Sequence, residues 1–242
     1  MKEIEVVLSM PLYHHRVVRN NSIAVVIEIL QASTSIISAL ENGVKSIIPV
    51  GSASEAEVMK NEGYLLAADN DGKKLSIADY NISADQYWDG KLKSEEIVYC
   101  TENGTKAFRL TREEADKVVV GAFTNLSALA KYLLDQNKNI ILVCAGNQNL
   151  MALEDQLCAG AIAEKLLESG EYDQHCDSVN ASIDVWEKAK PDLKSYIQKL
   201  SFKKRLPNVL TDEVIDYTFT PDSSDIIPIL HFNHITGLKY IK

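Results

Sequence analysis

The feature that most constrains the fold is an alternation of short apolar runs with amphipathic segments along most of the chain. The runs at 23–30 and 140–144 have the length and branching of strands that are buried on both faces. A segment with helical periodicity follows each of them, at 33–41 and at 153–169. Strands that alternate with helices predict βαβ units, and therefore a mainly parallel sheet with helices on both faces.

The remaining segments extend this pattern and then depart from it. Further strands are predicted at 46–50, 64–67, 97–100 and 118–120, and further helices at 54–63, 104–112 and 124–134. From 176 onward the pattern changes to helices ending near 190 and 200, with a late strand at 225–230. We therefore expect one α/β domain, 1–242, a three-layer α/β/α sandwich in which 176–242 form a C-terminal helical appendage and a strand that packs back on the core. Right-handed crossovers predict that all the strand ends lie on one edge of the sheet.

Composition excludes several classes of partner. The 34 acidic and 25 basic side chains give a net charge of −9, and aromatic residues make up only 7%, so a nucleic-acid surface is not expected. No stretch is long and apolar enough to span a bilayer. The four cysteines are widely scattered, which favours reduced thiols in the cytoplasm. A homodimer is one possible oligomeric state, because parallel α/β domains of this size often dimerise.

Carboxylates stand at the ends of several predicted strands. Glu28 lies inside an apolar run, where it is either buried with a partner, a proton or a metal ion, or else half-exposed at an edge. Asp69 follows another strand, and Glu154 and Asp155 open a helix, where the helix dipole alone also favours acidic residues. Such hard oxygen ligands suit Mg²⁺.

Small polar residues begin the helices that follow these strands. They either cap the helices or bind an oxyanion with the helix N–H groups, and for Thr105 both alternatives, a helix cap and part of an anion nest, stay open. Phosphate-binding loops of the Walker type and the G-x-G-x-x-G pattern are absent, which counts against NTPases and dinucleotide enzymes. The residues in question are Ser33, Thr34, Asn103, Gly104, Thr105, Lys106 and Asn125.

Several ordered motifs carry a family resemblance. They are Glu102-Asn103-Gly104-Thr105-Lys106-Ala107, Gly121-Ala122-Phe123-Thr124-Asn125, Cys144-Ala145-Gly146 and Leu153-Glu154-Asp155-Gln156-Leu157-Cys158-Ala159-Gly160. With these motifs the chain resembles the 2-phosphosulfolactate phosphatase family from about 23 to 229. The resemblance implies a three-layer α/β/α fold and a Mg²⁺-dependent hydrolase that converts (2R)-2-phospho-3-sulfolactate to 3-sulfolactate and phosphate. In methanogens that step belongs to coenzyme M biosynthesis.

The chain also departs from the family pattern. The family's Asp-Val-Leu-Arg-Ala-Thr stands here as Glu28-Ile29-Leu30-Gln31-Ala32-Ser33, and its Gly-Glu-Arg-Gly-Gly as Ala68-Asp69-Asn70-Asp71-Gly72. The arginine that follows Asn-Gly-Thr is Lys106 here, and Asn-Ser-Pro corresponds to Ile82-Ser83-Ala84. Neither an amide nor a lysine reproduces the planar fork with which arginine holds phosphate or sulfonate oxygens. Each lost charged partner costs roughly 1.5–3 kcal/mol of recognition.

These observations leave three hypotheses. The first is a Mg²⁺-dependent phosphatase acting on a small phosphorylated acid, by resemblance 2-phospho-3-sulfolactate. The second is a diverged phosphatase with a less charged substrate, and the third is a catalytically silent small-molecule binding protein on the same scaffold. In the first, the catalytic and metal-binding residues are Glu28, Asp69, Glu154 and Asp155, and the substrate-binding residues are Gln31, Ser33, Thr34, Asn103, Gly104, Thr105, Lys106 and Asn125.

Overall fold

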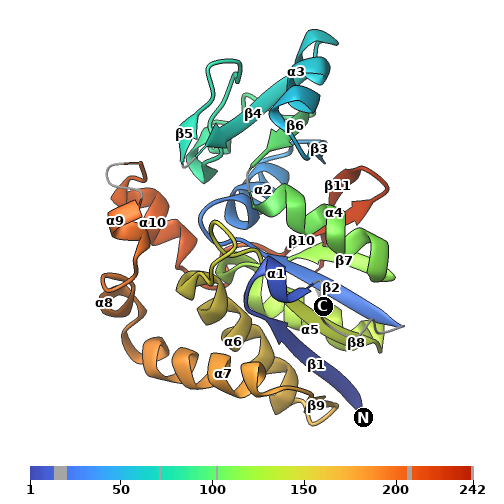
Figure 1. The fold of residues 1–242 in the computed structure, drawn as a ribbon, viewed down its shortest axis with the longest axis vertical. Helices are drawn as coiled ribbons and strands as arrows, with labels where there is room; N and C mark the ends of the chain where they lie inside the picture. Colours follow the sequence, from blue (N-terminus) through green and yellow to red (C-terminus); the bar gives the residue numbers. More distant parts are fainter. Residues whose placement is uncertain (14–20, 71, 102, 206–208, 241–242) are drawn as a thin grey trace.

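The computed structural model describes residues 1–13, 21–70, 72–101, 103–205 and 209–240. These residues form an α/β fold around an eleven-stranded sheet of order β5-β4-β6-β3-β11-β10-β7-β2-β8-β1-β9 (Figure 1). The strands are β1 (Lys2–Val7), β2 (Ser22–Ile27), β3 (Ser46–Pro49), β4 (Leu65–Asn70), β5 (Lys73–Lys74), β6 (Glu96–Cys100), β7 (Lys117–Val120), β8 (Asn139–Cys144), β9 (Tyr172–Gln174), β10 (Ile226–His231) and β11 (His234–Lys239).

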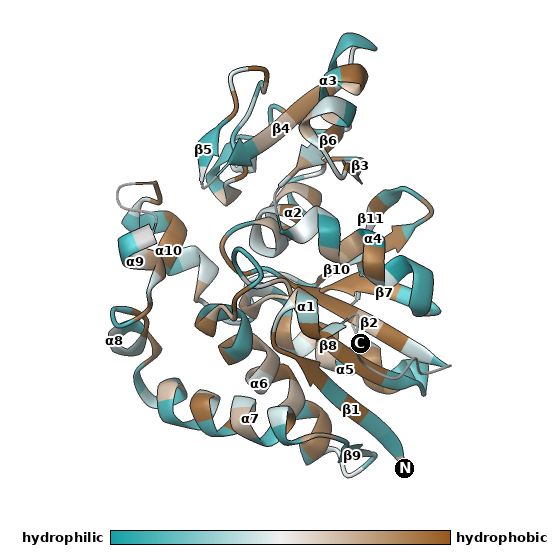
Figure 2. Ribbon diagram, in the orientation of Figure 1, coloured by the Kyte–Doolittle hydropathy of each residue, from teal (hydrophilic) through white to brown (hydrophobic). Residues whose placement is uncertain are grey.

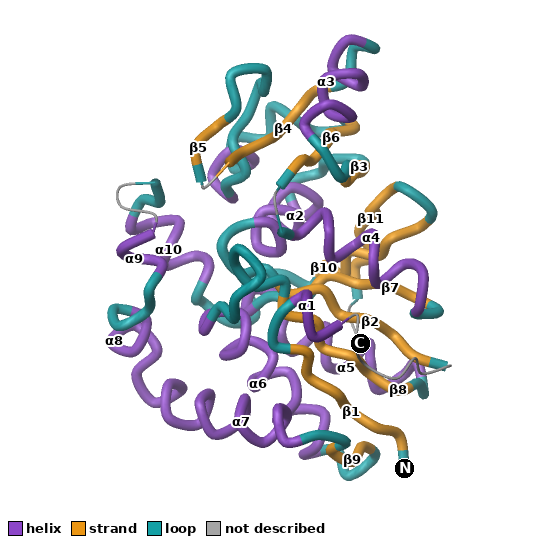
Figure 3. Tube along the Cα trace, viewed as in Figure 1, coloured by secondary structure: helices purple, strands orange, loops and turns teal. Residues whose placement is uncertain are grey.

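Helices cover both faces of this sheet, so the predicted three-layer α/β/α architecture is confirmed (Figure 3). The α-helices are α1 (Met10–Tyr13), α2 (Ala32–Glu41), α3 (Ala53–Asn61), α4 (Gly104–Glu114), α5 (Leu126–Gln136), α6 (Leu153–Glu168), α7 (Asp177–Ala189), α8 (Leu193–Ile197), α9 (Phe202–Arg205) and α10 (Asp212–Thr218). Short 3₁₀ turns are η1 (Ala84–Tyr87), η2 (Phe123–Asn125) and η3 (Lys190–Asp192). Among the described helices, none combines the length and the apolar character needed to cross a membrane.

The sheet consists of two parallel groups that run in opposite directions. Strands β7, β2, β8, β1 and β9 are parallel to one another, and so are β3, β6 and β4. The antiparallel hairpin β10–β11 joins the groups, because β10 pairs antiparallel with β7 and β11 antiparallel with β3. The expectation that all strand ends share one edge of the sheet was therefore wrong. Periodicity alone did not reveal β11, whose sequence is mostly exposed and contains Gly237.

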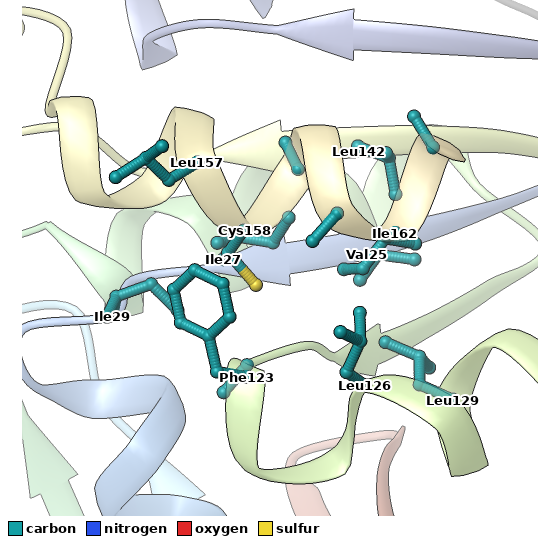
Figure 4. Packing of buried hydrophobic residues seen from close by; sticks show 14 of the residues in the cluster. Val25, Ile27, Ile29, Phe123, Leu126, Leu129, Leu142, Leu157, Cys158 and Ile162 are labelled. Carbon is teal, nitrogen blue, oxygen red and sulfur yellow. The ribbon is translucent and has the colours of Figure 1, made fainter. Parts of the chain in front are cut away.

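Strand β2 lies at the centre of the molecule, and all of its residues, Ser22–Ile27, are buried. On one face, Val25 and Ile27 pack with α5 and α6, where Figure 4 shows Phe123 and Cys158 beside them. On the other face, Val26 packs in a second cluster with residues of α2 and α4. The central strands are accordingly the most hydrophobic part of the ribbon in Figure 2. A third cluster places α3 on the β3–β6–β4 group.

The C-terminal part follows the predicted pattern, with differences at its ends. Helices α7 to α10 form the helical appendage, and β10 is the late strand that returns to the sheet. The edge strand β9 was not predicted, because three residues are too few to show an alternating pattern. Helix α3 begins after Ser52, whose hydroxyl accepts a hydrogen bond from the Glu55 N–H at 3.2 Å, rather than at Ser54 as the sequence suggested.

The close packing of α6 against α7 generates a prediction about stability. A Cβ atom on Gly160 would overlap the backbone carbonyl of Ser182 on α7. Because backbone cannot yield as a side chain does, we expect Gly160→Ala to lower the free energy of unfolding by about 1–3 kcal/mol. Urea unfolding followed by circular dichroism measures this loss.

The matched control is Gly51→Ala, where the nearest neighbour of the new Cβ is Glu55 Oε2 at an ordinary 3.8 Å. That variant should lie within about 0.5 kcal/mol of the parent protein. Equal stabilities of the two variants would contradict the packing argument.

Candidate active site at the ends of β2, β6 and β8

Glu28 lies where the end of β2 meets the start of α4. It follows the last residue of β2 and is 7% exposed, so the buried alternative of the sequence analysis holds. Its Oε2 occupies the space beside Gly104, the first residue of α4, so that a Cβ on Gly104 would overlap this oxygen. Thr101, which follows β6, lies at the same place, with its Oγ1 3.2 Å from that Cβ position. The ends of β2 and β6 therefore lie face to face although their groups run in opposite directions.

The turn from β2 into α2 is closed by its own side chains. The Glu28 N–H donates to Ser33 Oγ at 2.9 Å, and the Ser33 N–H donates to the Glu28 carbonyl at 2.9 Å. The Thr34 hydroxyl donates to the Ile29 carbonyl at 3.1 Å, and the Leu30–Gln31 peptide bond is cis. Ser33 and Thr34 are both buried, so their hydroxyls shape the turn that carries Glu28. Their predicted contact with substrate stays a prediction.

Asp155 ties the end of β2 to the end of β8. Its Oδ1 accepts the Ile29 N–H at 2.9 Å, its Oδ2 accepts the Gly146 N–H at 3.0 Å, and the side chain is 1% exposed. Burial raises the pKa of the Cys144 thiol, and the charge of Asp155 raises it further. Both carboxylate oxygens thus accept hydrogen bonds from backbone N–H groups, and this indicates that Asp155 positions the strand ends. Glu154, its neighbour in the first turn of α6, is also buried.

Gln31 presents a buried amide to a small cavity. The side chain is 7% exposed, and neither its Nε2 nor its Oε1 makes a hydrogen bond within the described part of the chain. The cavity, of about 10 Å³, is also lined by Thr34, by Ser83 next to η1, and by Val214 and Thr218 of α10. An amide buried without partners costs free energy, which a bound ligand recovers by hydrogen bonding to it. A cavity of this size holds about one water molecule, which would pair with the amide, so the contact of Gln31 with substrate stays a prediction.

The start of α4 is capped by a residue that the sequence analysis missed. Thr101 Oγ1 accepts the N–H groups of Gly104 at 3.1 Å and Thr105 at 3.4 Å, whereas Thr105 donates its hydroxyl to the Thr101 carbonyl at 2.6 Å. The helix-cap alternative for Thr105 was wrong, because Thr101 stands one turn earlier where the orphan N–H groups point. Lys106 is exposed and Asn103 is half-buried at this helix start.

Asp69 lies near the end of β6, on the side formed by β4 and β5. It is the penultimate residue of β4, is half-buried, and accepts the Gly72 N–H on Oδ2 at 3.0 Å in the turn to β5. Burial raises the pKa of the Cys100 thiol, and the charge of Asp69 raises it further. Asp69 therefore lies beside the end of β6. Asp71 and Glu102, which flank these turns in the sequence, lie outside the described residues.

Asn125 is fully engaged inside the protein. Its Oδ1 accepts the Ala122 N–H at 3.0 Å, and its Nδ2 donates to the carbonyls of Val120 at 3.2 Å and Ile226 at 3.0 Å. These bonds join β7 to the hairpin strand β10, and the side chain is 0% exposed. The geometry supports a structural role for Asn125, and its contact with substrate stays a prediction.

A chain of buried hydroxyls connects α2 to β6. The hydroxyls of Ser35 and Tyr99 lie 2.7 Å apart, and Tyr99 is also hydrogen-bonded to Tyr87 of η1. Burial raises the pKa of both tyrosines, so the phenols stay neutral and donate hydrogen bonds. The sequence gives only a weak signal for this series of hydroxyl groups, namely a tyrosine inside the apolar run of β6.

The four predicted carboxylates are not gathered into one metal-binding group. Within the described ranges, no three His, Cys, Asp or Glu side chains lie close enough together to hold a metal ion. Asp155 is engaged with the backbone, and Asp69 lies on the β4–β5 side. What the structure does bring together is Glu28, the Gly104 turn and the start of α2. Two helix N-termini and a buried carboxylate at one place suit binding of an anion beside an acidic group.

The position of Asp155 generates a prediction about stability. In Asp155→Asn the amide group faces one of the two backbone N–H donors, so one charge-assisted hydrogen bond is lost inside the protein. We expect the free energy of unfolding to fall by about 1.5–3 kcal/mol, measured by urea denaturation. Asp184→Asn, an exposed change on α7, is the control and should stay within about 0.5 kcal/mol. A stable Asp155→Asn protein would show that the carboxylate does not hold the strand ends.

Comparison with known proteins places the chain in a family. A family model described as 2-phosphosulpholactate phosphatase matches residues 9–233. A probable 2-phosphosulfolactate phosphatase of Caldanaerobacter subterraneus subsp. tengcongensis is 34% identical over 210 residues, which cover 85% of this chain and 86% of the relative. Proteins of the same name from Thermotoga maritima (32% identical, covering 90% and 92%) and Clostridium beijerinckii (28% identical, covering 86% and 88%) are also similar. The chain belongs to the 2-phosphosulfolactate phosphatase family.

Proposed function

We propose that this chain is a phosphoric monoester hydrolase that releases phosphate from a small phosphorylated acid. The observation that carries the proposal is the contact of the Glu28 carboxylate with Gly104, which brings the starts of α2 and α4 to one place. The names of the similar proteins support 2-phospho-3-sulfolactate as the substrate, with 3-sulfolactate and phosphate as products. In a methanogen that reaction would belong to coenzyme M biosynthesis.

The residues at this place have separable tasks. The first turns of α2 and α4 favour the phosphate group, because helix N-termini carry partial positive charge. The Gln31 amide donates a hydrogen bond to the acid part of the substrate, since it is buried and has no hydrogen bond within the described structure. Glu28 is the carboxylate beside the phosphate position, where its role is either to act on a proton of water or of the leaving oxygen or to hold the metal ion. Asp155 holds the turn that positions Glu28 and Gln31.

Mg²⁺ is the cofactor that we propose for this reaction. Mg²⁺ is usually held by one or two carboxylates together with water and substrate phosphate oxygens, so it does not need a cluster of three acidic side chains. Glu28 is the buried carboxylate beside both helix starts, which makes it the ligand that the donor set supports. When bound, the ion would neutralise charge on the phosphate group.

A second candidate is a phosphatase in this family with a less charged substrate. Gln31 and Asn70 stand where the family pattern has arginines, and the exposed Lys106 stands where it has a third. Amides hold an oxygen through single neutral hydrogen bonds, so a substrate without a sulfonate needs fewer charged partners.

Phosphate release decides between these candidates. Purified protein is incubated with 2-phospho-3-sulfolactate and with a panel of phosphorylated hydroxy acids, in the presence of Mg²⁺ and of EDTA. We expect turnover of phosphosulfolactate that EDTA abolishes. Glu28→Gln should lower kcat by at least about 100-fold, because it removes the charge at the reacting centre. Glu187→Gln on α7, an exposed glutamate, is the matched control and should keep full activity.

Each other outcome has a defined meaning. Turnover of another ester alone supports the less charged substrate. Activity that survives EDTA contradicts the Mg²⁺ proposal. No release from any ester by folded protein contradicts the hydrolase proposal and favours a silent binding protein.

The contact between positions 28 and 104 predicts a specific coupling. Gly104→Ala should lower kcat/KM at least about tenfold, because the new Cβ displaces the Glu28 carboxylate. Glu28→Asp shortens the side chain by one methylene and relieves that overlap, so Gly104→Ala should cost less in its background. A double-mutant cycle on kcat/KM is expected to show a coupling of at least about 1 kcal/mol. If the effects of the two substitutions on kcat/KM are additive, the side chain at position 104 does not act through Glu28.

Location and assembly are further proposals. We propose that the protein works in the cytoplasm, which its four free cysteines support. A homodimer stays a prediction that light scattering of the purified protein decides.

A further inference from the structure

A second concave surface lies on the other side of α4. It is a cleft of about 410 Å³ between the β3–α3 connection, helix α4 and the β10–β11 hairpin. Figure 1 shows these elements around it, with α3 and β3 on one side and α4 and β11 on the other. Gly104 faces Glu28, whereas Phe108, Arg109 and Arg112 line the cleft at a helical spacing. Thr105, in the first turn of α4, also lines the cleft, so the cleft adjoins the candidate active site but contains neither Glu28 nor Gln31.

The cleft gathers positive charge in a chain whose net charge is −9. Arg109 and Arg112 both line it from α4. Both side chains are exposed, and Arg112 Nη1 donates to Asn233 Oδ1 of the hairpin at 2.6 Å. The one carboxylate among the lining residues, Glu55, accepts the Gly51 N–H at 2.9 Å at the start of α3. Two guanidinium groups thus face a single carboxylate that the backbone already holds.

Apolar side chains form the remaining wall. Phe108 is buried, and Met59, Tyr64 and Leu230 are only partly buried where they line the cleft. The volume lies within the range of roughly 300–1,000 Å³ that is usual for small-molecule sites. Guanidinium groups bind phosphate or carboxylate oxygens, and the apolar wall suits an organic body. A cleft with both features is complementary to an organic anion rather than to a bare inorganic ion.

We propose that this cleft binds a small organic anion, with its phosphate, phosphonate or carboxylate group on Arg109 and Arg112 and an apolar or aromatic body against Tyr64, Met59 and Leu230. The proposal does not depend on the phosphatase activity. The proposed ligand contacts the arginines of α4, and the molecule then has a second anion site that contains neither Glu28 nor Gln31.

Calorimetric titration with phenylphosphonate tests the proposal, since this probe carries both features and is not hydrolysed. We expect it to bind at least about tenfold more tightly than methylphosphonate, which lacks the apolar body. Arg109→Gln should weaken phenylphosphonate binding at least about tenfold. Lys131→Gln, an exposed change of equal charge on α5, should leave the affinity within about twofold.

Two further variants locate the bound probe. Glu28→Gln should keep the affinity for phenylphosphonate within about twofold although it removes turnover, because the cleft does not contain Glu28. The Arg109→Gln/Arg112→Gln protein should lose binding further while keeping its circular dichroism spectrum and its turnover. No binding at about 1 mM, or equal binding to Arg109→Gln and Lys131→Gln, would overturn the proposal. So would binding that is lost in Glu28→Gln and unchanged in Arg109→Gln.

Discussion

The burial of β2 on both faces is the constraint from which the rest of the arrangement follows. A strand enclosed by helices on each side leaves its last backbone groups inside the protein, where each N–H and C=O requires a partner. Asp155 and Ser33 supply those partners at Ile29 and Glu28. The same pairing fixes the direction in which the chain leaves the strand. Glu28 and Gln31 are thus held in place by groups that themselves need not touch a substrate.

Helix α2 is the physical link between the two groups of strands. It starts at the end of β2, and its Ser35 hydroxyl is hydrogen-bonded to Tyr99 of β6. Because the groups run in opposite directions, a flat sheet would place the ends of β2 and β6 on opposite edges. Helix α2 packs with residues of both groups in the second hydrophobic cluster, and the two ends lie together beside its start. The Glu28–Gly104 contact is the result.

The sequence predicted well whatever depends on local pattern. The apolar runs at 23–30 and 140–144 lie over β2 and β8, and the helix starts near Gly104 and Glu154 were found within one or two residues. Contacts between segments that are distant in the sequence could not be predicted from local pattern. Nothing local distinguishes Asp155, whose oxygens bind the backbone, from Glu154 beside it, and both look like ligands or first-turn acids. The hairpin strand β11 was missed for the same reason, because its partners lie in the fold rather than in the neighbouring sequence. The cap at Thr101 is a local contact, with the N–H groups of Gly104 and Thr105, and it was missed because the Asn103-Gly104 turn drew the expected helix start away from Thr101.

The central place of the β10–β11 hairpin bears on how the protein is made. Its strands pair with Val119 of β7 and with Ile47 of β3, residues that leave the ribosome long before them. Until the hairpin emerges, the nascent chain carries two half-sheets with unpaired inner edges. Such edges attract other strands, and contacts of long sequence separation form slowly. The two half-sheets are therefore exposed to wrong pairing until the hairpin has been made, and the hairpin completes the sheet.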